Sequence, residues 1–231
     1  MIGIVVPAHN EESYIAAALG ALQLAAAHPD LAGENVRIVV VLDSCGDNTG
    51  AIAAACGVEV MALNVRNVGA VRAAGASLLL AAGARWLAFT DADTVVSPEW
   101  LVRQLEQGAD AVCGSIGVAD WRIHGTQADA LRDDFLRSYR DVDGHRHIHG
   151  ANLGVSAAAY VRAGGFQPLA CSEDVALVRA LEASGARIAW SAAPRVATSA
   201  RIDALARGGF GDAILAVLTA GLAAATLQAA E

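Results

Sequence analysis

Short apolar runs alternate with helical patterns through the first half of this chain, and this alternation constrains its fold more than any other feature. Apolar runs of strand length occupy residues 3–7, 37–43, 58–63 and 86–90. Helical patterns fill the segments between them, at residues 11–27, 49–56 and 69–82. Strands that alternate with helices at this spacing predict an α/β fold with a mostly parallel, doubly wound central sheet flanked by helices.

The alternation loosens after residue 110, and the second half of the chain is harder to assign. We expect a strand at residues 110–118, a charged helix at 126–139, a helix at 173–184 and a strand at 187–190. No stretch rich in Pro, Ser or charge separates the two halves, and the sequence has no internal repeat. The sequence therefore predicts a single domain over residues 1–231.

The C-terminal segment, residues 212–230, is rich in Ala and nearly uncharged. Larger side chains recur there every four positions, as one face of a packed helix requires, at Phe210, Ile214, Leu218 and Leu222. Ala, Gly, Thr and Gln dilute the apolarity that a membrane span needs. We therefore expect a C-terminal helix packed on the core, with docking on a membrane surface as the second option.

Charge and composition exclude several classes of function. The formal net charge is −8 and there is no basic tract, which disfavours nucleic acid as a partner. All 16 basic residues are Arg, so a Walker-type phosphate loop and Schiff-base chemistry are excluded. The cysteines are widely spaced, which favours free thiols in a reducing compartment over zinc or a disulfide framework. The amino-terminal residues lack the basic region of a signal peptide, so we expect a cytoplasmic protein.

Polar residues gather directly after the predicted strands of the first half. These clusters are His9-Asn10-Glu11, Asp43-Ser44, Asn64 with Asn67, and Asp91 with Asp93. In a doubly wound sheet, ligands bind beyond the carboxyl ends of the strands, where the strand order reverses. We therefore expect the clusters to form one ligand site.

The segment Asp91-Ala92-Asp93 is the most informative of these clusters. It follows the apolar run at 86–90, and carboxylates that leave water cost free energy unless they are paired or bind a cation. The pair therefore indicates a cation, a sugar hydroxyl or both. Two Asp residues at a strand end also act as turn formers and helix caps, so the pair by itself leaves that alternative open.

The same clusters and several later motifs occur in the order found in family 2 glycosyltransferases, which have the GT-A fold. The chain resembles that family at residues 6–12, 42–44, 67–72, 91–93, 150–152, 164–166 and 172–174. Each motif alone is weak, whereas their common order extends over most of the chain. The resemblance implies a nucleotide-binding half at residues 1–109 and an acceptor-side half at 110–231.

The resemblance assigns the opening motif to the donor nucleotide. It implies that Pro7, Ala8 and His9 form a backbone ledge for the base and that Glu11 contacts the ribose. A simpler explanation is helix capping, with Asn10 as the N-cap and Glu11 near the positive helix end. The sequence leaves both explanations open.

Four further residues would complete the nucleotide site. Asp43 resembles the carboxylate that accepts a hydrogen bond from the base, although the turn after it departs from the common pattern and leaves the base open between UDP and GDP types. Asn67, Gly69 and Arg72 lie at a predicted helix start, where backbone N–H groups and a guanidinium can bind the nucleotide or its diphosphate. A loop Gly and an exposed helix Arg are the plain alternative.

A divalent cation is implied at the Asp-x-Asp motif. Asp93 would bind Mg²⁺ or Mn²⁺ between the two phosphates, Asp91 would assist it, and Asp91 and Ala92 would contact the nucleotide. His147 and His149 are candidates for a third ligand, although three His in five residues more often form a solvated turn or contact substrate.

The acceptor side is implied by two later motifs. Asp174, supported by Glu173, resembles the catalytic base that takes the proton of the acceptor hydroxyl. Gly150, Ala151 and Asn152 resemble the loop under the donor sugar. Acidic residues at a helix start are also ordinary partners of the helix dipole.

The resulting hypothesis is a metal-dependent, inverting transferase that moves one sugar from a nucleotide-diphosphate sugar to an acceptor hydroxyl. A catalytically silent nucleotide-sugar binder is the main alternative. A nucleotidyltransferase or a Rossmann dehydrogenase is disfavoured, because Pro-Ala-His-Asn-Glu follows the first strand in place of a glycine-rich loop. We expect a cytoplasmic location, with the inner membrane surface as the alternative.

Overall fold

We analysed a computed structural model of the chain, which describes residues 1–202, 211, 214–215 and 219. The chain divides into two compact units. The larger unit comprises Met1–Gly117 and Asp141–Thr198, and the smaller one comprises Val118–Arg140 and Ser199–Glu231. All of the predicted site residues belong to the larger unit.

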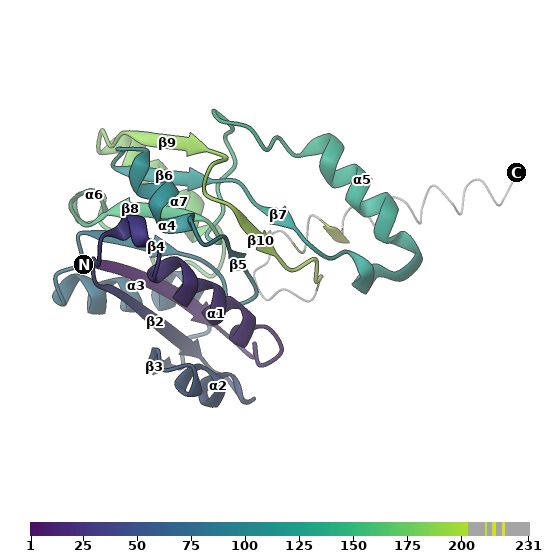
Figure 1. The fold of residues 1–231 in the computed structure, drawn as a ribbon, viewed down its shortest axis with the longest axis horizontal. Helices are drawn as coiled ribbons and strands as arrows, with labels where there is room; N and C mark the ends of the chain where they lie inside the picture. Colours follow the sequence, from purple (N-terminus) through teal and green to yellow (C-terminus); the bar gives the residue numbers. More distant parts are fainter. Residues whose placement is uncertain (203–210, 212–213, 216–218, 220–231) are drawn as a thin grey trace, which may run out of the picture. The chain divides into compact units, whose positions relative to one another are not determined.

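A seven-stranded sheet forms the centre of the larger unit (Figure 1). Its order is β3-β2-β1-β4-β8-β6-β9. The strands are β1 (Ile2–Ala8), β2 (Val36–Asp43), β3 (Glu59–Leu63), β4 (Trp86–Phe89), β6 (Ala111–Gly114), β8 (Leu153–Ser156) and β9 (Ile188–Ser191). Only β8 among these strands runs antiparallel to its neighbours, β4 and β6. The predicted mostly parallel sheet is therefore confirmed.

Helices cover both faces of this sheet. The helices are α1 (Ile15–Ala26), α2 (Thr49–Ala55), α3 (Val68–Ala81), α4 (Trp100–Glu106), α6 (Ala157–Arg162) and α7 (Glu173–Ala183). Buried residues of α3, α6 and α7 share one apolar core with the sheet residues Val5, Val39 and Phe89. On the opposite face, Gln104 of α4 accepts a hydrogen bond from Trp86 Nε1 at 3.0 Å. The α/β sheet is thus buried on both sides, which explains its continuous apolar strands.

Helix α3 approaches the sheet closely, and this approach positions one side of the site. A Cβ at Gly75 would lie 2.6 Å from Cγ1 of Val5, and one at Gly3 would lie 2.7 Å from Cδ1 of Leu79. Both positions therefore need glycine because helix and strand backbones pack against each other there. This contact holds α3 tightly against β1 and β2.

Further short elements are a second sheet and a 3₁₀ turn. A second sheet has the order β5-β10-β7, formed by β5 (Val95–Val96), β10 (Val196–Thr198) and β7 (Gly117–Val118). A 3₁₀ turn, η1 (Pro29–Leu31), joins α1 to β2.

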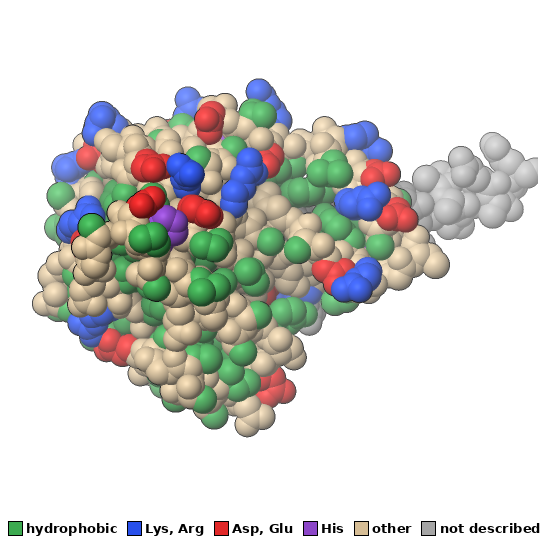
Figure 2. Space-filling view, viewed as in Figure 1, with side chains coloured by type: hydrophobic (Ala, Val, Ile, Leu, Met, Phe, Trp, Pro, Cys, Tyr) green, Lys and Arg blue, Asp and Glu red, His purple; other side chains and the backbone are tan. Residues whose placement is uncertain are grey.

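The smaller unit contains the 3₁₀ segment η2 (Arg122–Gln127) and the helix α5 (Ala128–Ser138). Trp121, Leu131, Ala200 and Ile214 form its apolar cluster. The outer surface of α5 carries acidic and basic side chains in mixed order, including Asp134 and Arg137, so it presents no patch of one sign (Figure 2).

Several predicted boundaries differ from the structure. The helix predicted at 11–27 begins at Ile15, and Asn10 does not cap it because Tyr14 is the N-cap residue. Asn10 instead adopts a left-handed backbone (φ 54°), and its side chain accepts a hydrogen bond from Gly46. The strand predicted at 110–118 is divided into β6 and β7.

The predicted C-terminal helix lies almost wholly outside the described residues. Among the residues that are described, no helix has the length and apolarity that crossing a membrane requires.

Candidate active site at the carboxyl edge of the sheet

The segment Asp91-Ala92-Asp93 forms a tight turn directly after β4. The backbone N–H of Thr94 donates to the carbonyl of Asp91 at 3.2 Å, which closes the turn. Ala92, between the two carboxylates, is buried with 2% exposure. The turn holds Asp91 and Asp93 at the edge of the sheet, where both remain partly exposed.

Arg72 of α3 is buried beside this turn. Its side chain is 3% exposed, and Nη2 donates to Oδ1 of Asp91 at 2.5 Å. Its Nε donates to Oε1 of Glu173 at 3.1 Å, and its Nη1 donates to the carbonyl of Gly150 at 3.0 Å. The guanidinium therefore joins three segments that are far apart in the sequence.

Gly150 connects this arginine to Asp174. A Cβ at position 150 would lie 2.5 Å from Arg72 Nη2, so a larger residue would displace the guanidinium. The backbone N–H of Gly150 donates to Oδ2 of Asp174 at 2.8 Å. The donor-side turn and the predicted catalytic base are thus linked by a continuous chain of hydrogen bonds.

The two acidic residues at the start of α7 occupy different environments. Glu173 is 6% exposed, and burial raises the pKa of its carboxyl while the charge of Arg72 opposes that increase. Asp174 is partly exposed, and its Oδ1 accepts from the N–H of Val175 at 2.7 Å. Ser172 precedes them with a left-handed backbone (φ 56°), which turns the chain into the helix. Of the two, Asp174 is the carboxylate that a substrate can reach.

A family comparison identifies the domain. Residues 3–160 match the model described as glycosyl transferase family 2. The chain belongs to that family. A comparison with curated protein sequences gave no match.

Solved structures of similar fold include glycosyltransferases. The chain superposes on S. aureus TarS 1-349 in complex with UDP with a TM-score of 0.63 and 17% identity, covering 87% of this chain and 60% of that one. Glucosyl-3-phosphoglycerate synthase from Mycobacterium tuberculosis, in complex with Mn²⁺, UDP and glucosyl-3-phosphoglycerate, gives a TM-score of 0.59 and 20% identity, covering 95% and 79%. A mannosyltransferase from Pyrobaculum calidifontis, in complex with GDP-Man and Mn²⁺, gives 0.61 and 16%, covering 90% and 58%. The chain thus has the GT-A fold and spans about 60% of the TarS fragment.

Asp43 of this family 2 domain holds the loop after β3. Its Oδ1 accepts from the backbone N–H groups of Val65 and Arg66, and its Oδ2 accepts from that of Asn67, each at 2.9 Å. Ser44 Oγ lies 3.0 Å from Oδ1. Burial raises the pKa of Asp43, but the backbone hydrogen bonds outweigh it and lower the pKa overall. Asp43 therefore shapes the loop, and because Oδ2 has a single partner while a carboxylate oxygen offers about two acceptor positions, its hydrogen bond to the base stays a prediction.

The start of α3 is also not the open anion site that the sequence predicted. The N–H of Gly69 donates to the carbonyl of Leu169 at 3.0 Å, and that of Ala70 donates to Oδ1 of Asn67 at 2.9 Å. A Cβ at Gly69 would lie 2.1 Å from the carbonyl oxygen of Gln167, so glycine is required for this close approach. The segment before α7 therefore occupies the helix start, and Arg72 is not the exposed helix Arg of the plain alternative.

The opening loop lies next to Asp43. Pro7 and Ala8 are the last residues of β1, and His9 Nδ1 lies 2.5 Å from the carbonyl of Asp43. The backbone N–H of Glu11 donates to Thr49 Oγ1 at 2.7 Å. The structure therefore places these residues at the carboxyl edge, where their contacts with base and ribose stay predictions.

Asn152 supports the predicted sugar loop from inside the protein. Its side chain is 0% exposed, its Oδ1 accepts from Trp100 Nε1 at 2.9 Å, and its Nδ2 donates to the carbonyls of Ser115 and Pro194 at 2.7 and 3.0 Å. The predicted hydrogen bond from this amide to a sugar therefore does not fit. Ala151 is also buried, at 6% exposure.

The histidines before Gly150 form a stacked column. The rings of His145 and His147 lie 5.4 Å apart, and those of His147 and His149 lie 6.0 Å apart, at angles of 22° and 26°. Burial, followed by the neighbouring imidazoles, lowers the pKa of His149 to about 4. Rings in a column do not point at a common centre, so the geometry does not support His147 or His149 as the third metal ligand.

The Asp-x-Asp turn fits a cation that is bound together with a nucleotide. Within the part of the chain that the structure describes, no group of three or more His, Cys, Asp or Glu side chains is placed to hold a metal ion. Asp91 and Asp93 supply only carboxylate oxygen, which hard divalent cations prefer, and Mg²⁺ commonly binds through one or two carboxylates plus substrate phosphates. The donor set therefore suits Mg²⁺ or Mn²⁺ with a diphosphate, and not a site made of protein ligands alone.

Asp47 and Thr49 support the site and were not predicted from the sequence. Asp47 Oδ1 accepts from Thr49 Oγ1 at 2.6 Å, and its Oδ2 accepts from the N–H of Glu12 at 3.1 Å. These bonds fix the loop after β2 against the loop after β1. Asp47 Oδ1 also accepts from the backbone N–H of Thr49, the first residue of α2, and an Asp shortly before a helix is a helix-start signal that could have indicated this role.

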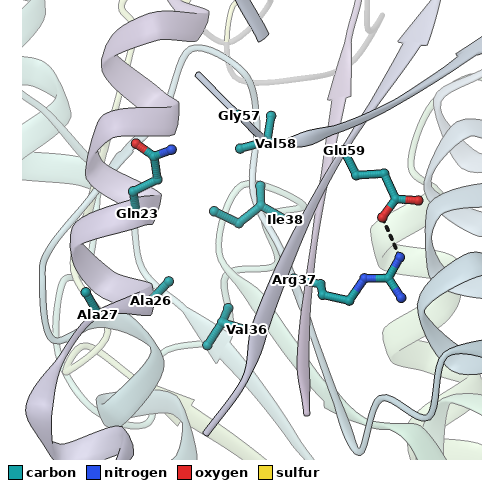
Figure 3. Close-up of a pocket in the computed structure, with 9 residues that line it drawn as sticks. All are labelled: Gln23, Ala26, Ala27, Val36, Arg37, Ile38, Gly57, Val58 and Glu59. Carbon is teal, nitrogen blue, oxygen red and sulfur yellow. Dashed lines mark hydrogen bonds and ion pairs between the residues drawn. The ribbon is translucent and has the colours of Figure 1, made fainter. Parts of the chain in front are cut away.

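A separate pocket lies at the opposite edge of the sheet (Figure 3). Its volume is about 400 Å³, and its walls come from the end of α1 and the starts of β2 and β3. Arg37 and Glu59 form an ion pair of 2.5 Å on its border. The pocket contains none of the predicted site residues.

Proposed function

We propose that this domain transfers one sugar from a UDP- or GDP-type nucleotide-diphosphate sugar to an acceptor hydroxyl, with inversion at the anomeric carbon. The observation that carries the proposal is the chain of contacts from Asp91 through Arg72 and Gly150 to Asp174. It brings a donor-side carboxylate and an accessible acceptor-side carboxylate to the same edge of a family 2 domain. The nucleotides in similar structures, UDP-GlcNAc and GDP-Man among them, support this donor class.

In this mechanism Asp174 is the general base. The acceptor oxygen forms a bond to the anomeric carbon from the face opposite the leaving group, its proton passes to Asp174, and the bond to the nucleoside diphosphate breaks. The N–H groups of Gly150 and Val175 hold the two carboxylate oxygens and orient them toward the acceptor. One positioned base contributes a factor on the order of 10²–10⁴ in rate.

The donor-side residues bind and orient the leaving group. Asp93, assisted by Asp91, would hold Mg²⁺ or Mn²⁺, which supplies neutralisation of charge on the departing diphosphate when bound. Pro7, Ala8 and His9 would support the base, and Glu11 would contact the ribose. Residues 1–109 then form the donor half and residues 110–231 the acceptor half of one transferase.

The first test is the variant Asp174→Asn. We expect it to abolish sugar transfer while nucleotide binding, measured by calorimetry, stays within about twofold of the wild type, because only the base is removed. Asp133→Asn, on the exposed surface of α5, is the matched control and should retain full activity. Transfer at the wild-type rate in Asp174→Asn would contradict the assignment of the base.

The second test separates a transferase from a silent binder. UDP- and GDP-sugars are incubated with the wild type and Mn²⁺, and both transfer and donor hydrolysis are followed. A catalytic domain releases nucleoside diphosphate. Binding of the nucleotide sugar without any release would instead favour the silent relative.

A further inference from the structure

We propose that Arg72 and Glu173 form an ion pair whose role is to position Asp174 and Asp91, and that Arg72 does not bind the diphosphate. The catalytic part of this inference rests on the proposed function. Its structural content, namely that Arg72 holds the loop that orients Asp174, can be tested without any enzymatic activity.

Each part of the guanidinium is directed at a different segment. Nη2 contacts Asp91 after β4, Nε contacts Glu173 on α7, and Nη1 contacts the carbonyl of Gly150 before β8. The Cζ atom lies 5.9 Å from the ring centre of Phe166, which covers the group from one side. A guanidinium donates through a planar fork in fixed directions, so these contacts determine the relative positions of the three segments.

The buried charge argues against a role as a phosphate ligand. Arg72 is 3% exposed, and both Asp91 and Glu173 already face it, with the charge of Asp174 also close enough to raise the pKa of Arg72. Burial lowers that pKa and is the largest single effect, but the carboxylates outweigh it. Because the guanidinium is buried among these groups, a diphosphate could reach it only if the surrounding segments moved. Neutralisation of the diphosphate would then come from the divalent cation that Asp93 and Asp91 would hold.

Gly150 transmits the position of Arg72 to Asp174. Its carbonyl accepts from Arg72 at 3.0 Å and its N–H donates to Asp174 at 2.8 Å, so the two contacts belong to one residue. Glu173 adds a second link, because it precedes Asp174 on α7 and is itself paired with Arg72. Removing the guanidinium would free both links at once.

The direct test is amide hydrogen exchange measured by NMR on the full chain. In Arg72→Met we expect the Gly150 N–H to exchange at least about tenfold faster, because its loop loses the contact that holds it. The N–H of Asn67, which is held by Asp43, should be unchanged. Arg37→Met removes another Arg–Glu pair at the opposite edge of the sheet and serves as the matched control, with no effect at Gly150.

A second variant keeps the proposal testable if Arg72→Met does not fold. Glu173→Gln keeps the size of the side chain and an acceptor for Arg72 Nε but removes the charge, so it should fold and raise exchange at Gly150 by a smaller factor. Unchanged exchange at Gly150 in either folded variant would overturn the proposal. Faster exchange restricted to Gly150 and Val175 would support it.

Kinetics distinguish positioning from donor binding. In Glu173→Gln and Arg72→Lys we expect kcat to fall by about tenfold or more, since a small misplacement of the base is costly, while the Kd for UDP or GDP changes by less than about threefold. A Kd that rises about tenfold in Arg72→Lys would make Arg72 a nucleotide ligand and overturn the inference. A wild type without transferase activity would refute the proposed function but leave the exchange experiment decisive for the ion pair.

Discussion

At the scale of single residues, the site depends on the difference between buried and exposed charge. Removing one partner of a buried ion pair typically costs about 3–5 kcal/mol, because the remaining charge is left without compensation. An exposed pair such as Arg103 and Glu106 contributes about 0–1 kcal/mol. Arg72 belongs to the first class, so its neighbours tolerate little change.

Gly150 gives the sharpest prediction at this scale. In Gly150→Ala the new Cβ would lie 2.5 Å from Arg72 Nη2, so either the guanidinium or the loop must move. We expect transfer to fall about tenfold or more and the free energy of unfolding to fall by about 1–3 kcal/mol, as overpacking in a core does. Steady-state kinetics and urea unfolding measure the two effects.

Gly20 on α1 provides the control for this substitution. A Cβ there would meet no atom within 4 Å, and its backbone is helical. Gly20→Ala should therefore leave transfer unchanged and stabilise the helix by about 0.5–1 kcal/mol. Equal transfer rates for the two alanine variants would show that the contact between Gly150 and Arg72 does not contribute to catalysis.

At the scale of elements, the buried parallel strands were the most predictable. The strands at 37–43 and 86–90 were placed within a residue of β2 and β4, because strands covered on both faces are continuous apolar runs. The strand β8 was missed. It contains Gly154, where a Cβ would lie 2.4 Å from Gln104 Oε1 and 2.6 Å from Trp86 Cζ2. Glycine is therefore required at position 154 by residues that are distant in the sequence. Glycine also weakens the apolar pattern by which a strand is recognised.

The ion pair between Arg85 and Glu34, at the amino edge of the sheet, gives a prediction at the element scale about how stability depends on pH. Arg85 before β4 donates from Nε and Nη2 to the two oxygens of Glu34 before β2, at 2.7 and 2.5 Å. This pairing with Arg85 lowers the pKa of Glu34 from 4.5 to about 2. A depressed carboxyl pKa stabilises the folded state above the ordinary pKa, and that stability is lost as the pH falls toward the lowered value.

We therefore expect the wild type to lose more stability than Glu34→Gln between about pH 5 and about pH 2, because only the wild type must protonate this carboxylate on unfolding. Urea unfolding at several pH values in this window measures the difference. Glu106→Gln, which removes an exposed pair, should follow the wild-type profile. If the free energy of unfolding of the wild type and of Glu34→Gln fell in parallel with pH, the ion pair between Arg85 and Glu34 would not control acid stability.

At the scale of the whole molecule, the sequence predicted which residues form the candidate site, but not which of them are hydrogen-bonded to other parts of the fold. The order of the motifs and the rule for strand ends were sufficient to place Asp91, Asp93 and Asp174 at one edge. The hydrogen bonds that Asp43 and Asn152 make within the protein were not predictable, because their partners come from other elements of the fold. A carboxylate that binds a ligand and one that holds a loop have the same pattern in the sequence, and only the packed structure separates them.

Stabilisation by ligand tests the donor site on the intact chain. A nucleotide that binds only the folded state adds about 2.7 kcal/mol at a concentration of about 100 times its Kd, so UDP or GDP with Mn²⁺ should raise the Tm. We expect the Mn²⁺-dependent part of the increase to disappear in Asp93→Ala, because that variant lacks the proposed principal ligand of the cation. Differential scanning fluorimetry with and without Mn²⁺ measures both contributions.

The control for this experiment is Asp30→Ala, which removes a carboxylate that is 71% exposed and lies in η1. It should retain the full Mn²⁺-dependent increase in Tm. An increase of the same size in Asp93→Ala would mean that the cation reaches the diphosphate without this residue. Asp93 would then not be the principal ligand of the cation. Asp91, which is already paired with Arg72, would be the remaining carboxylate of the turn. Comparing UDP with GDP in the same assay also separates the two bases, which the altered turn after Asp43 left open.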